Sequence, residues 1–298
     1  MELADALLQG QIDAAIMKTS SIEMIDEMGD FTGFASDVKL IYSGEFTIKV
    51  ATTEENVIDN YLSSDDVINV YISGIDSRGG INEVSRSDVN IIMSVNKKTH
   101  NILMINTPRD YYVPLSISNG VRDKLTHAGV YGIECSRNTL EMLYGIQIDY
   151  YVKVNFSGFE KIIDSLGGVD VTLDYSATLS QAGNLTVHNG VNHFNGEQAL
   201  AFARERYAYS DGDRQRGRNQ MMIMEAAIKK ACSPAIISNY TSVLSEVSKN
   251  VITDMSYDFI ADLAQTQLND MAAWNITQIS VTGVGSYSST TYSMPGWS

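Results

Sequence analysis

Cysteine and histidine are scarce in this sequence. Of 298 residues, only Cys135 and Cys232 are cysteines and four are histidines. The spacing of the two cysteines does not fit a zinc site, which excludes a structural metal cluster of that kind. Two interpretations of the pair stay open: two buried thiols, or one disulfide that clamps two helices in an oxidising compartment.

Proline, basic residues and long apolar runs are also few. Four prolines beside 22 glycines and 44% apolar residues exclude a disordered or fibrous chain. A net charge of -15 argues against a nucleic acid partner. No apolar run approaches the roughly 18 to 20 residues of a membrane span, and no secretory signal opens the chain. The sequence as it stands predicts a soluble globular protein of about one or two domains.

The first 60 residues differ from the rest. They contain no arginine, and the short apolar pieces DAAIM, VKLIY and FTIKVA alternate with an acidic, helix-like stretch. This pattern predicts part of a small α/β unit over residues 1–60, ahead of a main domain over residues 61–298. Because the chain opens on part of a helix followed by a strand, we expect an excised boundary there, with any membrane anchor upstream.

From Val67 onward, strand-like and helix-like segments alternate. VINVYISG is typical of a buried strand, and VNIIMSVN and NILMINT predict a hairpin around the turn KKTH. SRNTLEMLYG predicts a helix with Ser136 as its N-cap and Gly145 as its stop, and DYYVKV a strand. NFSGFEKIIDSLGG and VDVTLD repeat the scheme. Further helices are expected over 218–231, 236–247 and 257–271, before a last strand, NITQISV. This alternation predicts a layered α/β sheet.

Arginine is concentrated in one place. Five of the ten arginines fall within RERYAYSDGDRQRGR, residues 204–218. Arginine offers a rigid fork of donors that matches phosphate oxygens, and it does not lose its proton. The segment therefore predicts a polyanionic ligand such as a pyrophosphate. The alternative is a solvated loop whose arginines pair with Glu205, Asp211 and Asp213.

Two more arginines lie beside carboxylates at expected strand ends, Arg86 in SRSD and Arg109 in TPRD. Asp76 closes the first strand of the same sheet, and Asp88 opens the next. Sites on layered sheets gather at strand ends, so we expect the two aspartates to be neighbours. Two carboxylates beside arginines suit a divalent cation shared with phosphate oxygens. The alternative makes both aspartates loop caps or ion-pair partners.

Taken in order, these pieces resemble the LytR-CpsA-Psr family of bacterial cell-envelope glycopolymer ligases. The matching segments are GIDSR, RSDVNIIMSVN, TPRDYYV, KLTHA, IDYYVKVNFSGFEKIIDSLGGVDV, NGEQALAFARER and DGDRQRGRNQ. The resemblance implies a layered α-β-α catalytic domain with a central mixed β-sheet over residues 61–298, preceded by part of an accessory α/β domain.

The resemblance also implies an activity. It is the transfer of a phospho-glycopolymer, of teichoic acid or capsular polysaccharide type, from a polyprenyl (undecaprenyl) pyrophosphate carrier to the 6-hydroxyl of peptidoglycan N-acetylmuramic acid. An N-terminal membrane anchor absent from this chain would hold the catalytic domain outside the cell membrane of a Gram-positive-type envelope. The lipid tail needs an apolar cavity, which we expect the helix faces at 139–146, 156–166 and 220–231 to line.

The family's functional residues carry over by position. The resemblance implies that Asp76 and Asp88 hold Mg²⁺ or Mn²⁺, and that Asp213 orients or deprotonates the acceptor hydroxyl or holds Arg206. It implies that Arg86, Arg109 and Arg206 take part in catalysis. The pyrophosphate would be held by Arg86, Arg109, Lys124, Arg204, Arg206, Arg216 and Gln220.

The last motif departs from the family pattern. Arg214-Gln215 replaces the usual aromatic-glycine pair, and Asn219 replaces a common arginine. Arg214 and Arg218 are extra charges to which the resemblance assigns no role.

Two other functions stay open. A polyprenyl or nucleotide pyrophosphatase would use the same residues with water as acceptor, and only an acceptor-dependent product separates it from a ligase. A non-catalytic regulatory or lipid-precursor binding module is the third reading, and the intact aspartate and arginine set argues against it.

Overall fold

The computed structural model describes residues 67–77, 79–180, 184–209, 213–237 and 240–281. It also describes four short strands outside these ranges: β1 (Ala14–Lys18), β2 (Phe46–Val50), β15 (Ser286–Tyr287) and β16 (Ser293–Met294). β1 pairs antiparallel with β2, and β15 with β16. The expected strand VKLIY and most of residues 1–60 lie outside the described residues, so the predicted accessory unit and its boundary stay predictions.

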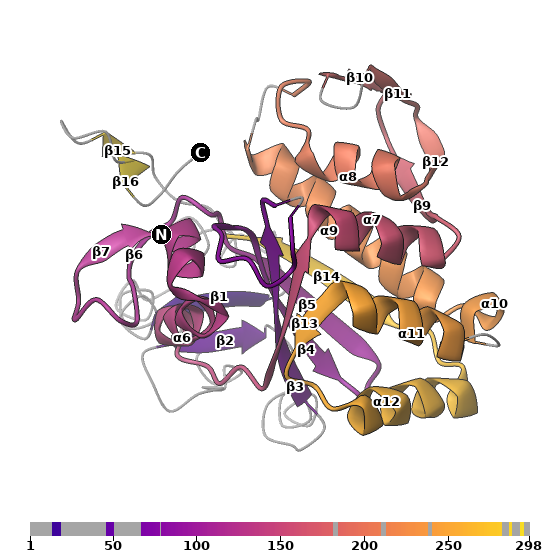
Figure 1. Cartoon of the computed structure of the whole chain (residues 1–298), viewed down its shortest axis with the longest axis horizontal. Helices are drawn as coiled ribbons and strands as arrows, with labels where there is room; N and C mark the ends of the chain where they lie inside the picture. Colours follow the sequence, from indigo (N-terminus) through magenta and orange to yellow (C-terminus); the bar gives the residue numbers. More distant parts are fainter. Residues whose placement is uncertain are drawn as a thin grey trace.

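A six-stranded mixed sheet lies at the centre of the fold (Figure 1). Its order is β13-β8-β3-β4-β5-β14. β3, β4 and β5 are antiparallel neighbours, while β8 runs parallel to β3 and β14 parallel to β5. The strands are β3 (Val67–Ile75), β4 (Ser87–Asn96), β5 (Asn101–Asn106), β8 (Tyr150–Asn155), β13 (Val251–Thr253) and β14 (Asn275–Ser280). The predicted strands and the hairpin around residues 97–100 are confirmed.

Helices cover both faces of this sheet. The helices are α5 (Leu125–Ala128), α6 (Ile133–Tyr144), α7 (Phe156–Ser165), α8 (Gly196–Arg204), α9 (Asp213–Ala231), α10 (Pro234–Ile237), α11 (Tyr240–Asn250) and α12 (Tyr257–Asp270), with a 3₁₀ turn η1 (Gly129–Tyr131). Three strand pairs flank them: β6 (Tyr112–Pro114) with β7 (Arg122–Lys124), β9 (Val169–Leu173) with β12 (Gly190–Phe194), and β10 (Ala177–Leu179) with β11 (Leu185–Val187).

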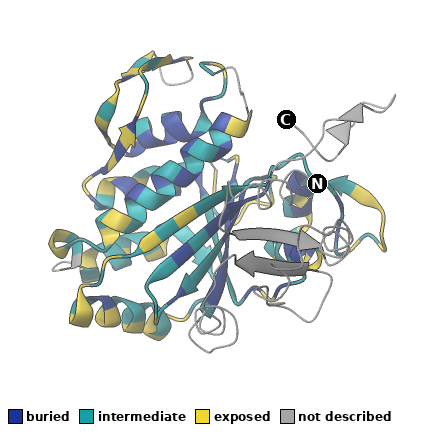
Figure 2. Ribbon diagram, turned by 180° about the vertical axis from the view of Figure 1, so that it is seen from behind, coloured by how far each residue is buried: buried dark blue, intermediate teal, exposed yellow. Residues whose placement is uncertain are grey.

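The core explains why the strands are apolar on both faces. Ile91 and Ile92 are adjacent in β4 and therefore point to opposite faces, yet both are fully buried. Ile92 packs with residues of α5 and α6, whereas Ile91 packs with residues of α9 and α12. A third core joins α7, α8 and α9 to β9–β12. Figure 2 shows the buried residues in the central strands and on the inner sides of these helices. The predicted layered α-β-α architecture is confirmed.

Three predicted helix limits were wrong. α6 begins at Ile133 and not after Ser136, because Gly132, at φ 109°, turns the chain into the helix; Ser136 is fully buried. α9 begins at Asp213, five residues before the expected start. The single helix expected over 236–247 is two elements, α10 and α11. The stop at Gly145 is confirmed, since this residue has the left-handed conformation.

Both cysteine thiols are free. Cys135 is buried in α6, and Cys232 is half-buried just after α9. Burial raises the pKa of the Cys232 thiol. The structure therefore favours the thiol interpretation over the disulfide, with only one of the two thiols fully buried. Within the described residues, no helix has both the length and the apolarity needed to cross a bilayer.

Candidate active site

A cavity of about 550 Å³ lies between the sheet and helices α7, α8, α9 and α11. Most of its wall is apolar. The apolar lining residues are Val70, Ile72, Ile75, Val89, Ile91, Met93, Val152, Val154, Phe156, Phe159, Ile162, Ile163, Leu200, Ala203, Ile223, Met224, Ala227, Val247, Val251 and Met255. The expected contributions from 156–166 and 220–231 are confirmed. The expected contribution from 139–146 was wrong, because Leu140 and Tyr144 pack in the core on the opposite face of the sheet.

One end of this cavity is charged, and we call it the charged end. β3 and β5 finish at the sheet edge where β4 begins, since these strands are antiparallel neighbours. Side chains that follow β3, open β4 and follow β5 therefore meet there, and the end of α8 and the start of α9 add theirs. The residues of the charged end are Asp76, Asp88, Arg109, Arg204, Arg206, Arg216 and Gln220.

Asp88 lies in a β-bulge. Gly74 pairs with Val89 and Ile75 pairs with Ser87, so Asp88 is the extra residue between them. A Cβ atom on Gly74 would lie 2.7 Å from Cγ2 of Val89, which makes glycine a requirement at this position. Bulges re-aim side chains and are common beside active sites. Here the bulge places a carboxylate on the cavity wall.

Buried hydroxyls hold the base of the bulge. The Oγ of Ser87 lies 3.0 Å from Oη of Tyr71 and 2.8 Å from Oγ of Ser73. The Tyr71 hydroxyl donates to Oδ1 of Asn90 at 2.7 Å. Burial raises the pKa of Tyr71, so its phenol stays neutral and keeps its proton for this bond. The network fixes the backbone on both sides of Asp88.

Arg109 is bound to Asp88. Its Nη1 donates to Oδ2 of Asp88 at 2.7 Å, and its Nε lies 3.7 Å from Oδ2 of Asp110. Thr126 donates to the other oxygen of Asp88 at 3.2 Å. Lys124 Nζ donates to Oδ1 of Asp110 at 2.7 Å. Lys124 therefore reaches the charged end only through Asp110 and Arg109, and it is not a lining residue of the cavity.

Aromatic rings support the two arginines at the end of α8. The guanidinium of Arg204 lies over the ring of Phe156, 4.4 Å from its centroid. The guanidinium of Arg206 lies 4.8 Å from the centroid of the Tyr207 ring, and its Nη2 donates to the Tyr207 hydroxyl at 2.6 Å. Cation–π contacts of this kind orient the guanidinium planes and leave N–H groups directed elsewhere.

Glu205 fixes the turn that carries Arg206. Sequence reasoning gave Glu205 only as a surface ion-pair partner, but it is fully buried. Its Oε1 accepts the backbone N–H groups of Arg206, Tyr207 and Ala208 at 3.0, 2.8 and 3.1 Å. The turn after α8 is thus built around this carboxylate. A glutamate between two arginines carries no sequence signal for such a role.

The unusual residues of the last motif fasten α9 to α8. Nε2 of Gln215 donates to Oδ1 of Asn219 at 2.8 Å, and Nδ2 of Asn219 donates to the carbonyl of Phe202 at 3.0 Å. Asn219 is fully buried. Arg216 and Gln220, four residues apart, line the cavity from α9. Two of the departures from the family pattern, Gln215 and Asn219, therefore have a structural role beside the charged residues.

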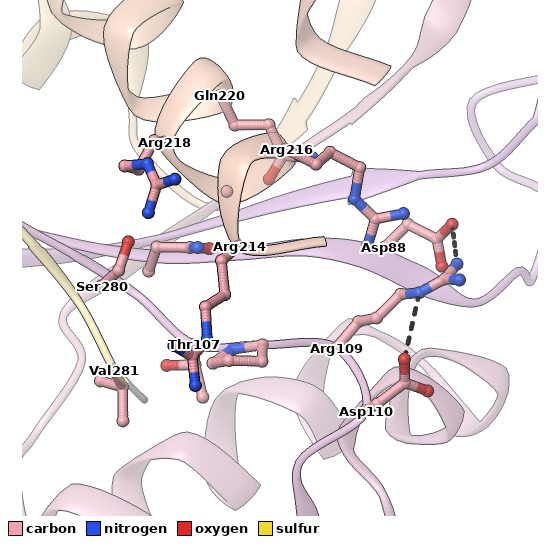
Figure 3. A pocket seen from close by; sticks show the side chains of 13 residues that line it. Asp88, Thr107, Arg109, Asp110, Arg214, Arg216, Arg218, Gln220, Ser280 and Val281 are labelled. Atoms are coloured by element: carbon pink, nitrogen blue, oxygen red, sulfur yellow. Dashed lines mark hydrogen bonds and ion pairs between the residues drawn. The ribbon is translucent and has the colours of Figure 1, made fainter. Parts of the chain in front are cut away.

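A smaller pocket of about 100 Å³ adjoins the charged end, and we call it the arginine pocket (Figure 3). Asp88, Arg109, Arg216 and Gln220 line both the pocket and the cavity. Residues that line the pocket but not the cavity are Asn106, Thr107, Pro108, Asp110, Arg214, Gly217, Arg218, Ser280 and Val281. Figure 3 shows Arg214 and Arg218 on the side of Ser280 and Thr107, and Arg216 on the side of Asp88.

Two of the predicted site residues, Arg86 and Lys124, are not brought to these walls, and the side chain of a third, Asp213, is not described. Arg86 is exposed just before β4 and lines neither the cavity nor the pocket. Lys124 lies behind Asp110, as described. Asp213 is the first residue of α9, and its side chain lies outside the described part of the chain. The role predicted for Asp213 stays a prediction.

The carboxylates suit a cation that arrives with phosphate. In the part of the chain that the structure describes, no three His, Cys, Asp or Glu side chains gather to hold a metal. Asp76 and Asp88 do line one cavity. Mg²⁺ is commonly held by one or two carboxylates, with substrate phosphates and water completing its shell. The residues present fit that arrangement and not an all-protein metal cage.

Known proteins share this chain's sequence pattern and fold. A model of the LytR_cpsA_psr family matches residues 38–296. The chain is 34% identical over 198 residues to the polyisoprenyl-teichoic acid–peptidoglycan teichoic acid transferase TagU of Bacillus cereus; the match covers 65% of this chain and 62% of that protein. It therefore spans less than two thirds of that curated relative.

Solved structures are similar as well. The crystal structure of B. subtilis TagV has a TM-score of 0.67 at 27% identity, over 78% of this chain and 92% of that one. A structure of TagT bound to LI-WTA has a TM-score of 0.63 at 28% identity, over 77% of this chain and 84% of that one. The mixed sheet and its covering helices are thus an arrangement found in these proteins too.

Proposed function

The chain belongs to the LytR-CpsA-Psr family, and from this premise we propose that it is a phosphotransferase acting on lipid-linked glycopolymers. It moves an anionic glycopolymer, of teichoic acid or capsular polysaccharide type, from a polyprenyl pyrophosphate to peptidoglycan. The acceptor is the 6-hydroxyl of N-acetylmuramic acid. The name of the Bacillus cereus relative, a teichoic acid transferase, supports this class of reaction.

One observation carries the proposal: the same cavity has an apolar interior and a charged end. A polyprenyl pyrophosphate has the same two parts, a hydrocarbon chain and a phosphate pair. Burying apolar surface contributes roughly 25 cal/mol per Å², so an apolar wall of this extent favours a hydrocarbon ligand. The arginines at the charged end favour phosphate oxygens, which they bind through paired N–H donors.

The transfer is a substitution at the phosphorus atom that carries the glycan. The acceptor oxygen forms a new bond to this phosphorus, and the bond from phosphorus to the bridging oxygen breaks. The electron pair leaves with the polyprenyl phosphate, and the acceptor proton passes to a base. Asp213, at the start of α9, is the proposed base or orienting group.

Positioning and charge dominate reactions of this type. Arg109 and Arg216 reach the phosphates from opposite walls, since one follows β5 and the other lies on α9. Arg204 and Arg206 are held by aromatic rings and by the turn around Glu205. These arginines stabilise the charge that develops on the phosphoryl oxygens and on the leaving phosphate.

A divalent cation completes the proposed site. Asp76 and Asp88 would hold Mg²⁺ or Mn²⁺, which supplies positive charge to the pyrophosphate oxygens when bound. Thr126 and Arg109 keep the Asp88 carboxylate in one orientation for this purpose.

The proposed substrate also indicates where the protein acts. A polyprenyl carrier stays in the membrane, and peptidoglycan lies outside it. We therefore propose that the catalytic domain lies at the outer surface of the cell membrane of a Gram-positive-type envelope, held there by a membrane anchor.

Lipid extraction and turnover test the proposal together. The purified chain is examined by native mass spectrometry for bound polyprenyl phosphate, and then incubated with a polyprenyl pyrophosphate-linked glycan, Mg²⁺ and peptidoglycan strands. We expect polyprenyl phosphate to be released with the glycan joined to the strand, and EDTA to stop the release. Equal release with and without strands would make the protein a pyrophosphatase. A protein that binds but never turns over the donor would be a binding module.

A further inference from the structure

The start of α9 presents its arginines in two directions. Arg214 and Arg218 are four residues apart and share one side of the helix, whereas Arg216 between them points to the other. In Figure 3, Arg216 extends toward Asp88, and Arg214 and Arg218 extend into the arginine pocket. The proposed transfer uses Arg216 and leaves the other two without a role.

The arginine pocket has the chemistry of an anion site. Four arginines line it against two aspartates, in a chain whose net charge is -15. Among the described residues, no hydrogen bond or ion pair engages the exposed side chain of Arg214. Positive charge gathered in one hollow of an acidic protein favours a negatively charged ligand.

One polar group of the pocket is held in place, and another has no partner. Nε and Nη2 of Arg218 both donate to Oε1 of Gln215, at 2.9 and 2.6 Å, which fixes the plane of its guanidinium. The Oγ of Ser280 is buried and has no hydrogen-bond partner within the described residues. A buried hydroxyl without a partner costs roughly 1–3 kcal/mol, and a ligand oxygen in the pocket would remove that cost. Ser280 is thus a second, independent sign of a ligand.

The size and position of the pocket limit what the ligand can be. A water molecule occupies roughly 30 Å³ in the liquid, so a pocket of about 100 Å³ has room for a small oxyanion group. The pocket shares Arg109 and Arg216 with the charged end. A group bound there is therefore attached close to the pyrophosphate.

We propose that the arginine pocket binds an anionic group, a carboxylate or a phosphate, carried by the donor glycan beside the pyrophosphate. This inference rests on the proposed function, because it takes the charged end as the pyrophosphate site. Arg214, Arg218 and Ser280 bind the anion, and through it they select donors by the charge of the first sugars. The pyrophosphate itself stays with Arg109 and Arg216.

Two donors that differ in one group test the proposal. Both are polyprenyl pyrophosphate disaccharides, one with a uronic acid as its second sugar and one with the neutral hexose. The dissociation constant of each is measured for the chain and for the double variant Arg214→Gln/Arg218→Gln. The control, Lys229→Gln/Lys230→Gln, removes two positive charges from the last turn of the same helix.

We expect the chain to bind the acidic donor about tenfold more tightly than the neutral one, the size of one charged hydrogen bond. The double variant should lose this preference and bind the neutral donor within about twofold of the parent. Arg214→Gln alone, at an exposed position, should lose part of the preference without a change in melting temperature. The lysine control should keep it.

Three results would overturn the proposal. Equal affinity of the parent chain for the two donors would show that the arginine pocket does not bind the anionic group of the donor. An equal loss for both donors in the double variant would place Arg214 and Arg218 in the pyrophosphate site. A parent chain that binds neither donor would contradict the proposed function as well, and this result is distinct from binding without preference.

Discussion

Arg109 and Asp88, which sequence patterns assigned to different ligands, bind each other: Nη1 of the arginine lies 2.7 Å from Oδ2 of the aspartate. Their side chains are 25% and 17% exposed, so solvent screens the pair only in part. A carboxylate has about four lone-pair positions, and the arginine and Thr126 use one on each oxygen. Asp88 thus keeps acceptor capacity for a cation while Arg109 holds it in place.

Asp88→Asn and Arg109→Lys should each lower kcat by about 100-fold or more, since each removes charge or bidentate geometry from the reacting phosphates. Both variants should stay folded, with a loss of about 1–3 kcal/mol in unfolding free energy for the broken pair. The measurements are acceptor-dependent release of polyprenyl phosphate and denaturant unfolding. The control is Asp170→Asn, which breaks the half-exposed pair with His193. Full turnover in either site variant would refute the site assignment.

Glu205→Ala should disable the site without touching a ligand. Three backbone N–H groups lose their acceptor, at a cost of roughly 2–4 kcal/mol in unfolding free energy, and Arg206 loses its fixed turn. We expect the KM for the donor to rise more than kcat falls. Glu205→Gln keeps a carbonyl oxygen as acceptor and should restore most of the activity. If glutamine is no better than alanine, the charge of Glu205 matters and its positioning role is wrong.

Gly217→Ala should lower turnover about tenfold although alanine favours helices by about 1 kcal/mol over glycine. A Cβ atom at this position overlaps the side-chain amide of Asn106, so either this amide or the start of α9 has to shift. We expect the helix to shift, because Asn106 is buried, and Arg216 to move with it. The measurements are donor turnover and melting temperature. Gly80→Ala, where a Cβ meets no atom within 4 Å, is the control. Adding Asn106→Ala to the first variant should recover activity; no recovery would show that the clash is not the cause.

Met224→Glu should prevent the polyprenyl chain from binding in the apolar cavity. Met224 is half-buried on α9 and lines the cavity, so a carboxylate there faces the hydrocarbon chain and makes its burial costly. We expect polyprenyl phosphate to be absent from the purified variant by lipid extraction, with a melting temperature within a few degrees of the parent. Met224→Leu, which keeps an apolar wall, should retain the lipid. Retention by the glutamate variant would mean that the lipid lies elsewhere.

Much of the fold followed from the sequence because the central strands are largely apolar and the turn between β4 and β5 is short. A hairpin brings the start of its first strand beside the end of its second, which is why Asp88 and Arg109, each predicted at a strand end, lie at one edge of the sheet. The apolar stripe at 139–146 was different. A helical stripe shows that a face is buried, but not against which face of the sheet, and α6 covers the side away from the cavity.

The positions of some charged residues were also not predictable from the sequence. Because the expected helix began at Arg218, Arg214 and Arg216 could not be assigned to a face of the helix. The sequence therefore did not predict that the arginines of α9 point in two directions. Glu205 was missed because its partners are backbone N–H groups, which no side-chain pattern reveals. The order of motifs predicted the candidate site residues. The fold of the backbone determines which of them line the same cavity.

Helix α9 touches the proposed donor along its whole length, from the anion beside Arg214 through the phosphates at Gln220 to the hydrocarbon at Ala227. These contacts span roughly 20 Å of one rigid rod. The helix therefore fixes the distances between the three parts of the binding site. A donor that differs in one of these parts can be accommodated by substituting the residue of α9 that contacts it. A single inserted residue after Gln220 would turn everything beyond it by about 100°. The apolar wall would then face away from a carrier whose phosphates are still correctly held, so this family member can vary by substitution along α9 but not by length.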